Sequence, residues 1–259
     1  MARWLFDCRP LCGRPWRLGL ASTSAERDAA FRLRYDVFFR EAGYGSTTPI
    51  DGRDVDAIDD WCDHLILYDT ESDRVIGTYR VIHGTDALRH GGLYGEFEFD
   101  LSPLQPIVPH ILQGGRTCVA AGFRQGPAFQ YLSYGMELLL REAGSRYFLG
   151  VESFLVDSPA TLHRIYSCIR QFGTDPEWRV QPQPGSRVAD LREVPVGPAD
   201  ERILPGIIRM DLRMGFRACG PPAWDPDFRS YDLLMLGRRD RLTPFYDAFL
   251  ARVERNLQK

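Results

Sequence analysis

One arginine lies in a glycine-containing loop between an apolar segment and a helical one, a combination that can bind an anion. Residues 117–121 have the pattern of a strand, residues 122–127 hold two glycines and Arg124, and residues 128–143 have helical periodicity. Free N–H groups and a positive dipole at a helix N-terminus favour a phosphate. Arg124, Gly126 and Ala128 are therefore candidate phosphate ligands, although an ordinary strand–helix–strand crossover gives the same local pattern.

Four charged residues stand in stretches that are otherwise apolar. Glu152 interrupts a strand predicted over residues 147–154, and Arg34, Arg80 and Arg116 fall in apolar helix or strand segments. A buried carboxyl group needs a partner or a raised pKa, and a buried guanidinium usually pairs with acids or with a ligand's carboxylate. Glu152 therefore either lines a cleft or serves the structure. Each arginine pairs either with acids of the chain or with a bound substrate.

The elements that must position these residues alternate in type. The pattern predicts β-α-β-β, a long irregular segment over residues 84–110, and then β-α-β-α-β-α-β, which indicates an α/β (α+β) protein with a mixed sheet flanked by helices. A Thr23–Glu26 capping box opens the first helix, which ends near Glu41. Further strands are expected at residues 17–22, 64–68, 74–82, 147–154, 178–180 and 231–236, and further helices at 158–172, 204–214 and 242–257.

The composition is ordinary for a globular protein. The 259 residues are 44% hydrophobic and 26% charged, which suits a single extended domain, placed here over residues 17–259. Residues 1–16 mix arginines, aromatic residues and two prolines, and we expect a loosely packed N-terminal arm. A net charge of −3 gives no case for nucleic-acid binding, and six scattered cysteines form no zinc pattern, so no metal is expected. No secretory signal or membrane-length run is recognised, which predicts a cytoplasmic protein.

The order of elements resembles the GNAT N-acyltransferase fold, with its mostly antiparallel central sheet. The run RYDVF at residues 34–38, followed by Asp56, Asp59 and Arg116, is similar to the acyl-homoserine-lactone synthases. A closer resemblance is to the L-ornithine Nα-acyltransferases of ornithine-lipid biosynthesis, and it extends over roughly residues 17–236. That resemblance is carried by DDWCDHL at residues 59–65, GLYGEFEFDL at 92–101, GRTCV at 115–119, residues 204–215, and PAWDPDF at 222–228.

The resemblance implies transfer of a long fatty acyl group, expected to be 3-hydroxylated, to the α-amine of an amino acid. Ornithine is the expected acceptor, and the product would be lyso-ornithine lipid. The donor would be the phosphopantetheine thioester of acyl carrier protein, or acyl-CoA, with no permanently bound cofactor. Acyl carrier protein and the amino acid would be the partners, and peripheral contact with the inner membrane is left open. Two alternatives remain: a synthase of another N-acyl amino acid or a lactone-type signal, and a non-catalytic GNAT-like binding protein.

The resemblance also assigns roles to residues. Asp56 and Asp59 match acids that handle the amino substrate, although a solvated acidic loop would explain them equally; Asp54 is expected at the surface. Backbone N–H groups near Val119 are the candidate oxyanion hole, because the fourth and fifth strands of this fold splay there. Tyr166 lies where GNAT enzymes keep a tyrosine that protonates the leaving sulfur, or else in the core. With Glu152 these form the expected catalytic group, and the expected substrate-binding residues are Arg34, Phe38, His64, Arg80, Glu98, Gln113 and Arg116.

Two departures from the family pattern concern this site. Gln113 stands where the family usually keeps a glutamate, so Gln113→Glu is expected to leave activity unchanged or raise it. The loop with Arg124, Gly126 and Ala128 keeps the arginine and glycine but not the usual spacing. The second departure suits acyl carrier protein, which presents one phosphodiester.

Overall fold

A computed structural model describes residues 2–8, 15–45 and 51–257. Within them, a nine-stranded sheet follows the order β1-β2-β3-β4-β6-β7-β11-β10, and β9 also pairs with β11. The β6–β7 pair is parallel and the other pairs of this described sheet are antiparallel, which confirms the predicted mixed, mostly antiparallel sheet. The strands are β1 (Arg3–Cys8), β2 (Trp16–Leu20), β3 (Asp63–Asp69), β4 (Arg74–His83), β6 (Ile111–Val119), β7 (Tyr147–Phe154), β9 (Arg217–Ala218), β10 (Ala223–Asp225) and β11 (Ser230–Arg238).

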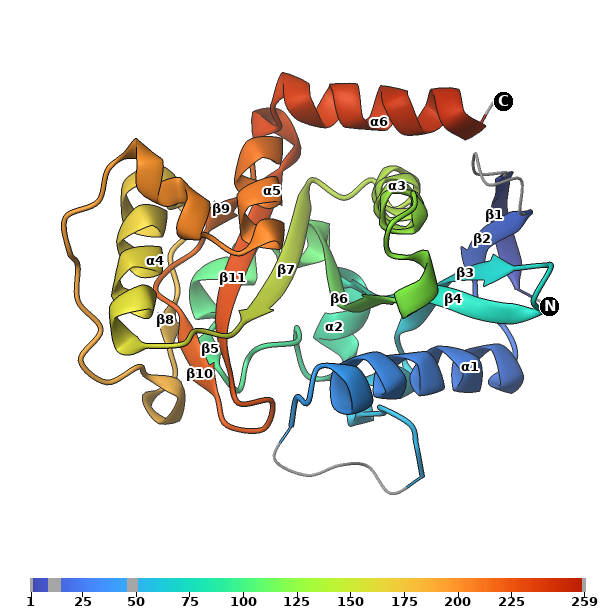
Figure 1. The fold of residues 1–259 in the computed structure, drawn as a ribbon, viewed down its shortest axis with the longest axis horizontal. Coiled ribbons are helices and arrows are strands. Elements are labelled where there is room, and N and C mark those ends of the chain that lie inside the picture. The colour runs from blue at the N-terminus through green and yellow to red at the C-terminus, as the bar shows by residue number, and fades with distance from the viewer. Residues whose placement is uncertain (1, 9–14, 46–50, 258–259) are drawn as a thin grey trace.

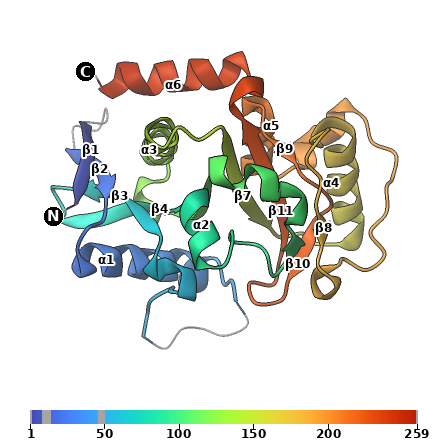
Figure 2. The ribbon, with the colours of Figure 1, turned by 180° about the vertical axis from the view of Figure 1, so that it is seen from behind.

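Helices cover both faces of this sheet. Helix α1 lies on one face and α3 on the other, in both views of the ribbon (Figures 1 and 2). Helices α5 and α6 lie on the α3 side, and a small sheet pairs β5 (Phe99–Asp100) with β8 (Gln181–Pro182). The helices are α1 (Ser24–Tyr35), α2 (Gly84–His90), α3 (Ala128–Glu142), α4 (Pro159–Phe172), α5 (Gly206–Met214) and α6 (Pro244–Leu257). None of the helices in the described part of the chain is long and apolar enough to cross a bilayer.

Local sequence explains how the first helix starts and ends. The Thr23 hydroxyl accepts a hydrogen bond from the Glu26 amide (3.2 Å), and the Glu26 carboxylate accepts one from the Thr23 amide (3.0 Å), as the capping-box prediction requires. After Tyr35 the chain continues as a π-helical turn over Asp36–Glu41. This wider turn carries Phe38 to the cleft described below.

The structure differs from the sequence predictions in four segments. The strand predicted over residues 117–121 is the end of a longer strand, β6, which runs over Ile111–Val119 and stops before Ala120. Residues 3–8 of the expected arm form β1, which pairs antiparallel with β2, while residues 9–14 lie outside the described residues. No strand forms at residues 178–180; Val180 instead donates to the Cys219 carbonyl (2.6 Å) as part of a loop. The segment predicted to be irregular, residues 84–110, contains α2 and a 3-10 helix over Ser102–His110.

Strand β6 carries two irregularities that open the centre of the sheet. Thr78 of β4 is opposite Cys118 and Arg80 is opposite Gly115, so Tyr79 faces two residues of β6, which is a β-bulge. One of those two, Arg116, has a φ of 51°, in the left-handed region. The parallel pairing of β6 with β7 stops at Gly114–Gly150, although both strands continue. The two strands therefore diverge beyond that pair.

Candidate active site

A cleft lies where β6 and β7 diverge. Strands β6 and β7 supply its floor, and aromatic side chains from α1's π-helical extension, from β4 and from three loops supply its walls. Aromatic walls with a few polar groups are typical of small-molecule sites. The lining residues are Phe38, Tyr44, Tyr79, Tyr94, Gly114, Gly115, Arg116, Thr117, Val151, Glu152, Ser153 and Phe228.

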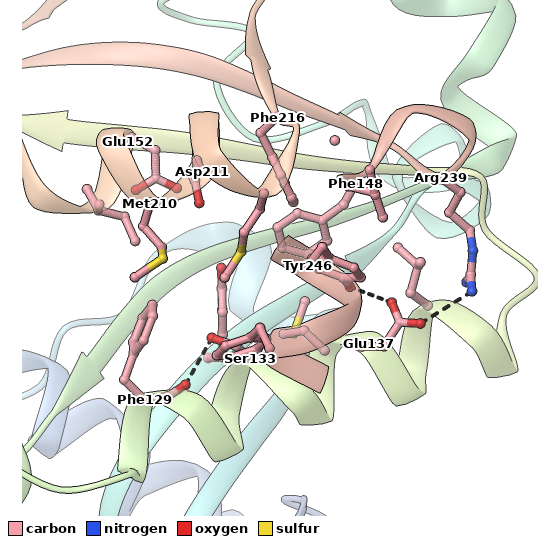
Figure 3. A pocket seen from close by; sticks show the side chains of 18 residues that line it. Phe129, Ser133, Glu137, Phe148, Glu152, Met210, Asp211, Phe216, Arg239 and Tyr246 are labelled. Atoms are coloured by element: carbon pink, nitrogen blue, oxygen red, sulfur yellow. Dashed lines mark hydrogen bonds and ion pairs between the residues drawn. The ribbon is translucent and has the colours of Figure 1, made fainter. Parts of the chain in front are cut away.

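An apolar pocket lies on the α3 side of the same opening, between α3, β7, α5 and α6 (Figure 3). Its walls include Phe129, Phe148, Met210 and Phe216. At one end Glu137 accepts a hydrogen bond from the Tyr246 hydroxyl (2.6 Å). This pocket has the character needed for a hydrocarbon chain, because apolar and flexible side chains dominate its wall.

Tyr79 and Glu152 line both the cleft and the apolar pocket. Burial, reinforced by the charge of Asp232, raises the pKa of Glu152 to about 7. Burial and then the neighbouring Glu152 raise the pKa of Asp211 well above its usual value. Glu152 can therefore exchange a proton near neutral pH at the point where the two cavities meet.

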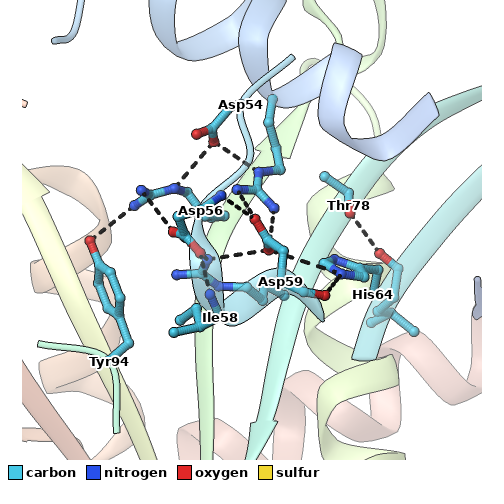
Figure 4. A network of polar contacts seen from close by, with 11 residues as sticks. Asp54, Asp56, Ile58, Asp59, His64, Thr78 and Tyr94 are labelled. Atoms are coloured by element: carbon cyan, nitrogen blue, oxygen red, sulfur yellow. Dashed lines mark hydrogen bonds and ion pairs between the residues drawn. The ribbon is translucent and has the colours of Figure 1, made fainter. Parts of the chain in front are cut away.

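Two buried arginines and three aspartates form an ionic network beside the cleft (Figure 4). Arg34 binds Asp59 through two hydrogen bonds (2.8 and 3.0 Å) and Asp54 through a third (2.8 Å). Arg80 binds Asp56 at 2.7 Å and Asp59 at 3.3 Å. Burial opposes ionisation of Asp59, but the hydrogen bonds and charge of Arg34 outweigh it and lower the pKa of Asp59.

This network changes two of the sequence interpretations. Asp54, expected at the surface, is 4% exposed and is held by Arg34 and by Arg116 (3.2 Å), so that expectation was wrong. Asp59 and Arg34 are buried and bind each other, which gives both a structural task. Asp56 differs, because its side chain is 31% exposed. It lines a second hollow next to the cleft, and Tyr94 lines both.

Arg116 connects the network to the cleft. Its guanidinium donates to the Tyr94 hydroxyl (3.0 Å), lies 3.4 Å from Asp56, and stacks over the Phe228 ring at 4.3 Å. Although burial opposes it, the charges of Tyr94, Asp54 and Asp56 raise the pKa of Arg116. Arg116 therefore presents a fixed positive charge at the cleft wall.

Gln113 and His64 lie behind the cleft rather than in it. The Gln113 side chain accepts from the Tyr94 amide (2.9 Å) and donates to the Tyr94 carbonyl (2.8 Å), so it fixes the backbone of that wall residue. The buried His64 ring contacts the Asp59 carbonyl through Nε2 (3.2 Å) and packs edge-on against Phe31. Burial lowers the pKa of His64, so its ring is neutral at pH 7.

Val119 is the last residue of β6, at the end of that strand where β7 no longer pairs with it. Ala120 donates to the Ile76 carbonyl (2.8 Å), which makes Gly77 and Val119 a non-hydrogen-bonded pair. The N–H of Val119 therefore points away from β4, toward the side from which β7 has diverged. The Val119 carbonyl accepts from Arg124 (2.8 Å), which also pairs with Glu41.

Gly126 and Ala128 lie just after that contact, at the start of α3. The helix begins at the buried Ala128 and has no side-chain N-cap, so its first amides lack the usual side-chain acceptor. Tyr166 lies on α4 and is not among the residues that line the cleft or the apolar pocket. The structure thus brings Glu152, Arg116 and Phe38 together in the cleft and leaves Tyr166 away from it.

Glu98 belongs to a separate buried cluster with Asp225 and Asp232. One carboxylate oxygen from each lies within 4.8 Å of the others, and the three residues are at most 1% exposed. Asp225 and Asp232 were missed in the sequence analysis. The signal that singled out Glu152, an acid inside an apolar strand, applies equally to Asp232 in YDLLML.

Residues 33–134 match the family model of the acetyltransferase (GNAT) domain. L-ornithine N(alpha)-acyltransferases from Brucella abortus and Rhodobacter capsulatus are each 28% identical to this chain, over 247 and 234 residues. These alignments cover 89% and 85% of this chain and 86% and 89% of the relatives. The chain is an N-acyltransferase, and over residues 33–134 it is similar to the GNAT acetyltransferase domain.

Solved structures agree with this N-acyltransferase in fold. BjaI, described as a CoA-dependent acyl-homoserine lactone synthase, superposes with a TM-score of 0.52 at 15% identity, covering 89% of this chain and 83% of BjaI. FeeM, described as an N-acyl amino acid synthase from uncultured soil microbes, gives a TM-score of 0.51 at 11% identity, covering 90% and 97%. At these identities the likeness shows the GNAT fold of the N-acyltransferase.

Proposed function

We propose that the enzyme transfers a long-chain acyl group from a thioester to the α-amine of an amino acid, with ornithine as the acceptor. The observation that carries this proposal is the meeting of a polar cleft and an apolar pocket at Tyr79 and Glu152. One cavity suits an amino acid and the other an alkyl chain. The relatives named L-ornithine N(alpha)-acyltransferase support ornithine.

The donor's acyl chain occupies the apolar pocket in this proposal, between Phe129, Met210 and Phe216. Its thioester carbonyl then lies in the opening between β6 and β7. The Val119 N–H, which points into this opening, donates to the oxyanion. The phosphopantetheine arm runs past Gly126 toward the amides that begin α3 at Ala128.

Glu152 is the proposed general base. The amine must lose a proton before or during its attack on the thioester carbonyl, and a carboxylate with a pKa of about 7 can accept it at neutral pH. The nitrogen forms the new C–N bond, the C–S bond breaks, and the donor leaves as a thiolate that takes up a proton. Arg116, with its charge at the cleft wall, binds the acceptor's α-carboxylate.

Three finer points belong to the same proposal. Acyl carrier protein is the donor, with acyl-CoA as the alternative thioester; the acyl chain is 3-hydroxylated; and the product is lyso-ornithine lipid. A second acyltransferase would then have to esterify the free hydroxyl group. Asp56 orients the acceptor's ammonium from the edge of the cleft, since it is the partly exposed acid of the ionic network.

The test is mass spectrometry of the purified enzyme's products. The enzyme is incubated with ornithine and either 3-hydroxyacyl carrier protein or 3-hydroxyacyl-CoA, and Glu152→Gln is the matched inactive control. We expect N-acyl-ornithine whose fragments place the acyl group on the α-nitrogen, with the carrier-protein donor faster. Acylation of another amino acid in preference to ornithine would show that ornithine is not the acceptor. Binding of the donor without release of free thiol would contradict the proposal that the protein is an enzyme.

A further inference from the structure

The Glu98–Asp225–Asp232 cluster gathers three carboxylates where little of the chain neutralises them. Neither carboxylate oxygen of the fully buried Glu98 has a hydrogen-bond partner in the described structure. Asp225 accepts from the Asp227 and Phe228 amides (2.7 and 3.0 Å), and Asp232 accepts from the Ser230 hydroxyl (2.9 Å). Two members are therefore oriented by donors of the chain, whereas Glu98 has Asp232, another acid, beside its carboxyl group.

Such a cluster is neutralised either by bound protons or by a cation. Burial first, and then the charge of Asp232, raise the pKa of Glu98 to about 10. Burial likewise raises the pKa of Asp232. Without a cation, bound protons neutralise these carboxylates. A cation that displaces the protons would be held by the negative charge of the carboxylates as well as by hydrogen bonds.

The cluster lies directly behind the acceptor cleft. Asp232 pairs across β7 and β11 with Ser153, which lines the cleft. Asp225 lines an adjoining hollow, and that hollow shares Tyr94, Arg116 and Phe228 with the cleft. A ligand held at Arg116 would therefore lie in a hollow that Asp225 also lines.

The oxygens lie close enough together to contact one ammonium group. Charge-assisted N–H···O bonds are about 2.8 Å long, so three oxygens arranged around one tetrahedral nitrogen lie about 4.6 Å apart. The cluster's oxygens lie within 4.8 Å of one another. An ammonium group has three donors, one for each carboxylate.

We propose that Glu98, Asp225 and Asp232 bind the side-chain ammonium of the acceptor and make the enzyme select an amino acid with a second amino group. This inference rests on the proposed function and adds the residues that choose the acceptor. Arg116 then holds the α-carboxylate and the cluster holds the far ammonium. The α-amine, lying between these two anchors, is directed toward Glu152. Acylation at the α-nitrogen rather than the side-chain nitrogen follows from this orientation.

The test compares ornithine with 2-aminopentanoate, which has the same carbon skeleton without the terminal amine. For the wild-type enzyme we expect kcat/KM to favour ornithine by about 100-fold or more, because the analogue leaves buried polar groups unpaired. Glu98→Gln and Asp232→Asn should reduce that preference at least tenfold, mainly by raising KM for ornithine and not KM for 2-aminopentanoate. Because the charge of Asp232 also raises the pKa of Glu152, the two acceptors are compared within each variant. Asp190→Asn, at an exposed acid that lines neither the cleft nor the adjoining hollow, should keep the full preference.

Calorimetric titration of ornithine and of 2-aminopentanoate, without donor, gives a readout that is independent of turnover. Equal affinity for both ligands, or an unchanged preference in the Glu98 and Asp232 variants, would overturn this inference and leave the proposed function intact. Tight binding of Mn²⁺ or Ca²⁺ by the wild type, lost in Glu98→Gln, would also overturn it and make the cluster a metal site. Failure to acylate any amino acid would reject the proposed function, and this inference with it.

Discussion

Tyr79 and Glu152 are the two residues common to the acceptor cleft and the apolar pocket, and they come from different strands, β4 and β7. The bulge in β6 lies opposite Tyr79, and Glu152 lies beyond the last β6–β7 pair. An irregularity in one strand thereby exposes a single carboxylate to both cavities.

Replacement of Glu152 by glutamine should lower kcat at least 100-fold, because an amide cannot accept the proton. Since burial raises the pKa of Glu152 to about 7, the wild-type kcat/KM should rise with pH through about 7 as the carboxylate forms. Below that pH the rate should fall about tenfold per unit. The measurement is a pH–rate profile at low acceptor concentration, with Glu201→Gln, an exposed glutamate, as control. If Glu152→Gln showed the same rise in kcat/KM near pH 7 as the wild type, another group would be the one that titrates.

Met210→Trp should shorten the acyl chain that the enzyme accepts. The larger side chain fills the apolar pocket beside Phe129 and Phe148, so kcat/KM should drop at least tenfold for long-chain donors and little for short-chain ones. The measurement is a chain-length series of acyl donors. Leu88→Trp, an exposed position on α2, is the control. Equal losses at every chain length would contradict this use of the pocket.

Asp59→Asn should destabilise the protein before it affects the chemistry. Its place in the expected catalytic group predicts a loss of turnover, but its buried contacts with Arg34 and Arg80 favour a loss of about 3–5 kcal/mol in the free energy of unfolding. The folded-state pKa of Asp59 is lowered, so its stabilisation is present above the unfolded pKa of about 3.9 and disappears as pH falls below it.

Denaturant titrations at several pH values measure that loss. The gap between wild type and Asp59→Asn should be constant from pH 7 to about 5 and should narrow at lower pH. Asp60→Asn, the exposed neighbour, should match the wild type. Full stability with lost turnover would return Asp59 to a catalytic role.

Gln113→Glu should weaken the enzyme instead of leaving or raising its activity. An ionised carboxylate still accepts from the Tyr94 amide but cannot donate to the Tyr94 carbonyl, and leaving that buried pair unmade costs about 1–3 kcal/mol. Because Tyr94 contacts Arg116, KM for the acceptor should rise as well. Thermal unfolding and acceptor kinetics, with the exposed Gln125→Glu as control, measure both effects. A stable and faster variant would contradict this prediction and would favour a catalytic role for a carboxylate at position 113.

The sequence predicted the order of elements well, because hydrophobic periodicity and caps are local. The Thr23–Glu26 cap and the hairpin of β3 and β4 are confirmed almost residue for residue. Strand β1 was missed because its pattern mixes arginine, aspartate and aromatic residues, and it is defined by pairing with β2. Pairing of this kind depends on tertiary contacts that periodicity does not contain.

The residue types of the site were predicted from the sequence, but their positions relative to one another were not. Arg34, Arg80 and Arg116 were expected to pair with acids, and they do, but the partner Asp54 lies in a polar loop that carries no pattern. Glu98, Asp225 and Asp232 are far apart in the sequence and meet only when β10 and β11 lie beside the Glu98 loop. Residue type could indicate which groups need partners, whereas the fold decides which partners they have.

The opening between β6 and β7 also has a kinetic consequence. Helices α1 and α3 lie on opposite faces of the sheet (Figure 1). Phe129 of α3 lines the apolar pocket and Phe38, just after α1, lines the cleft, so donor and acceptor would reach the opening from different sides. Neither substrate has to wait for the other, and a ternary complex can assemble in either order. A bisubstrate ligand, in which an alkyl chain is joined covalently to an amino acid, could occupy both cavities through the opening. Once one part is bound, the other binds intramolecularly, and such linkage can raise affinity by several orders of magnitude.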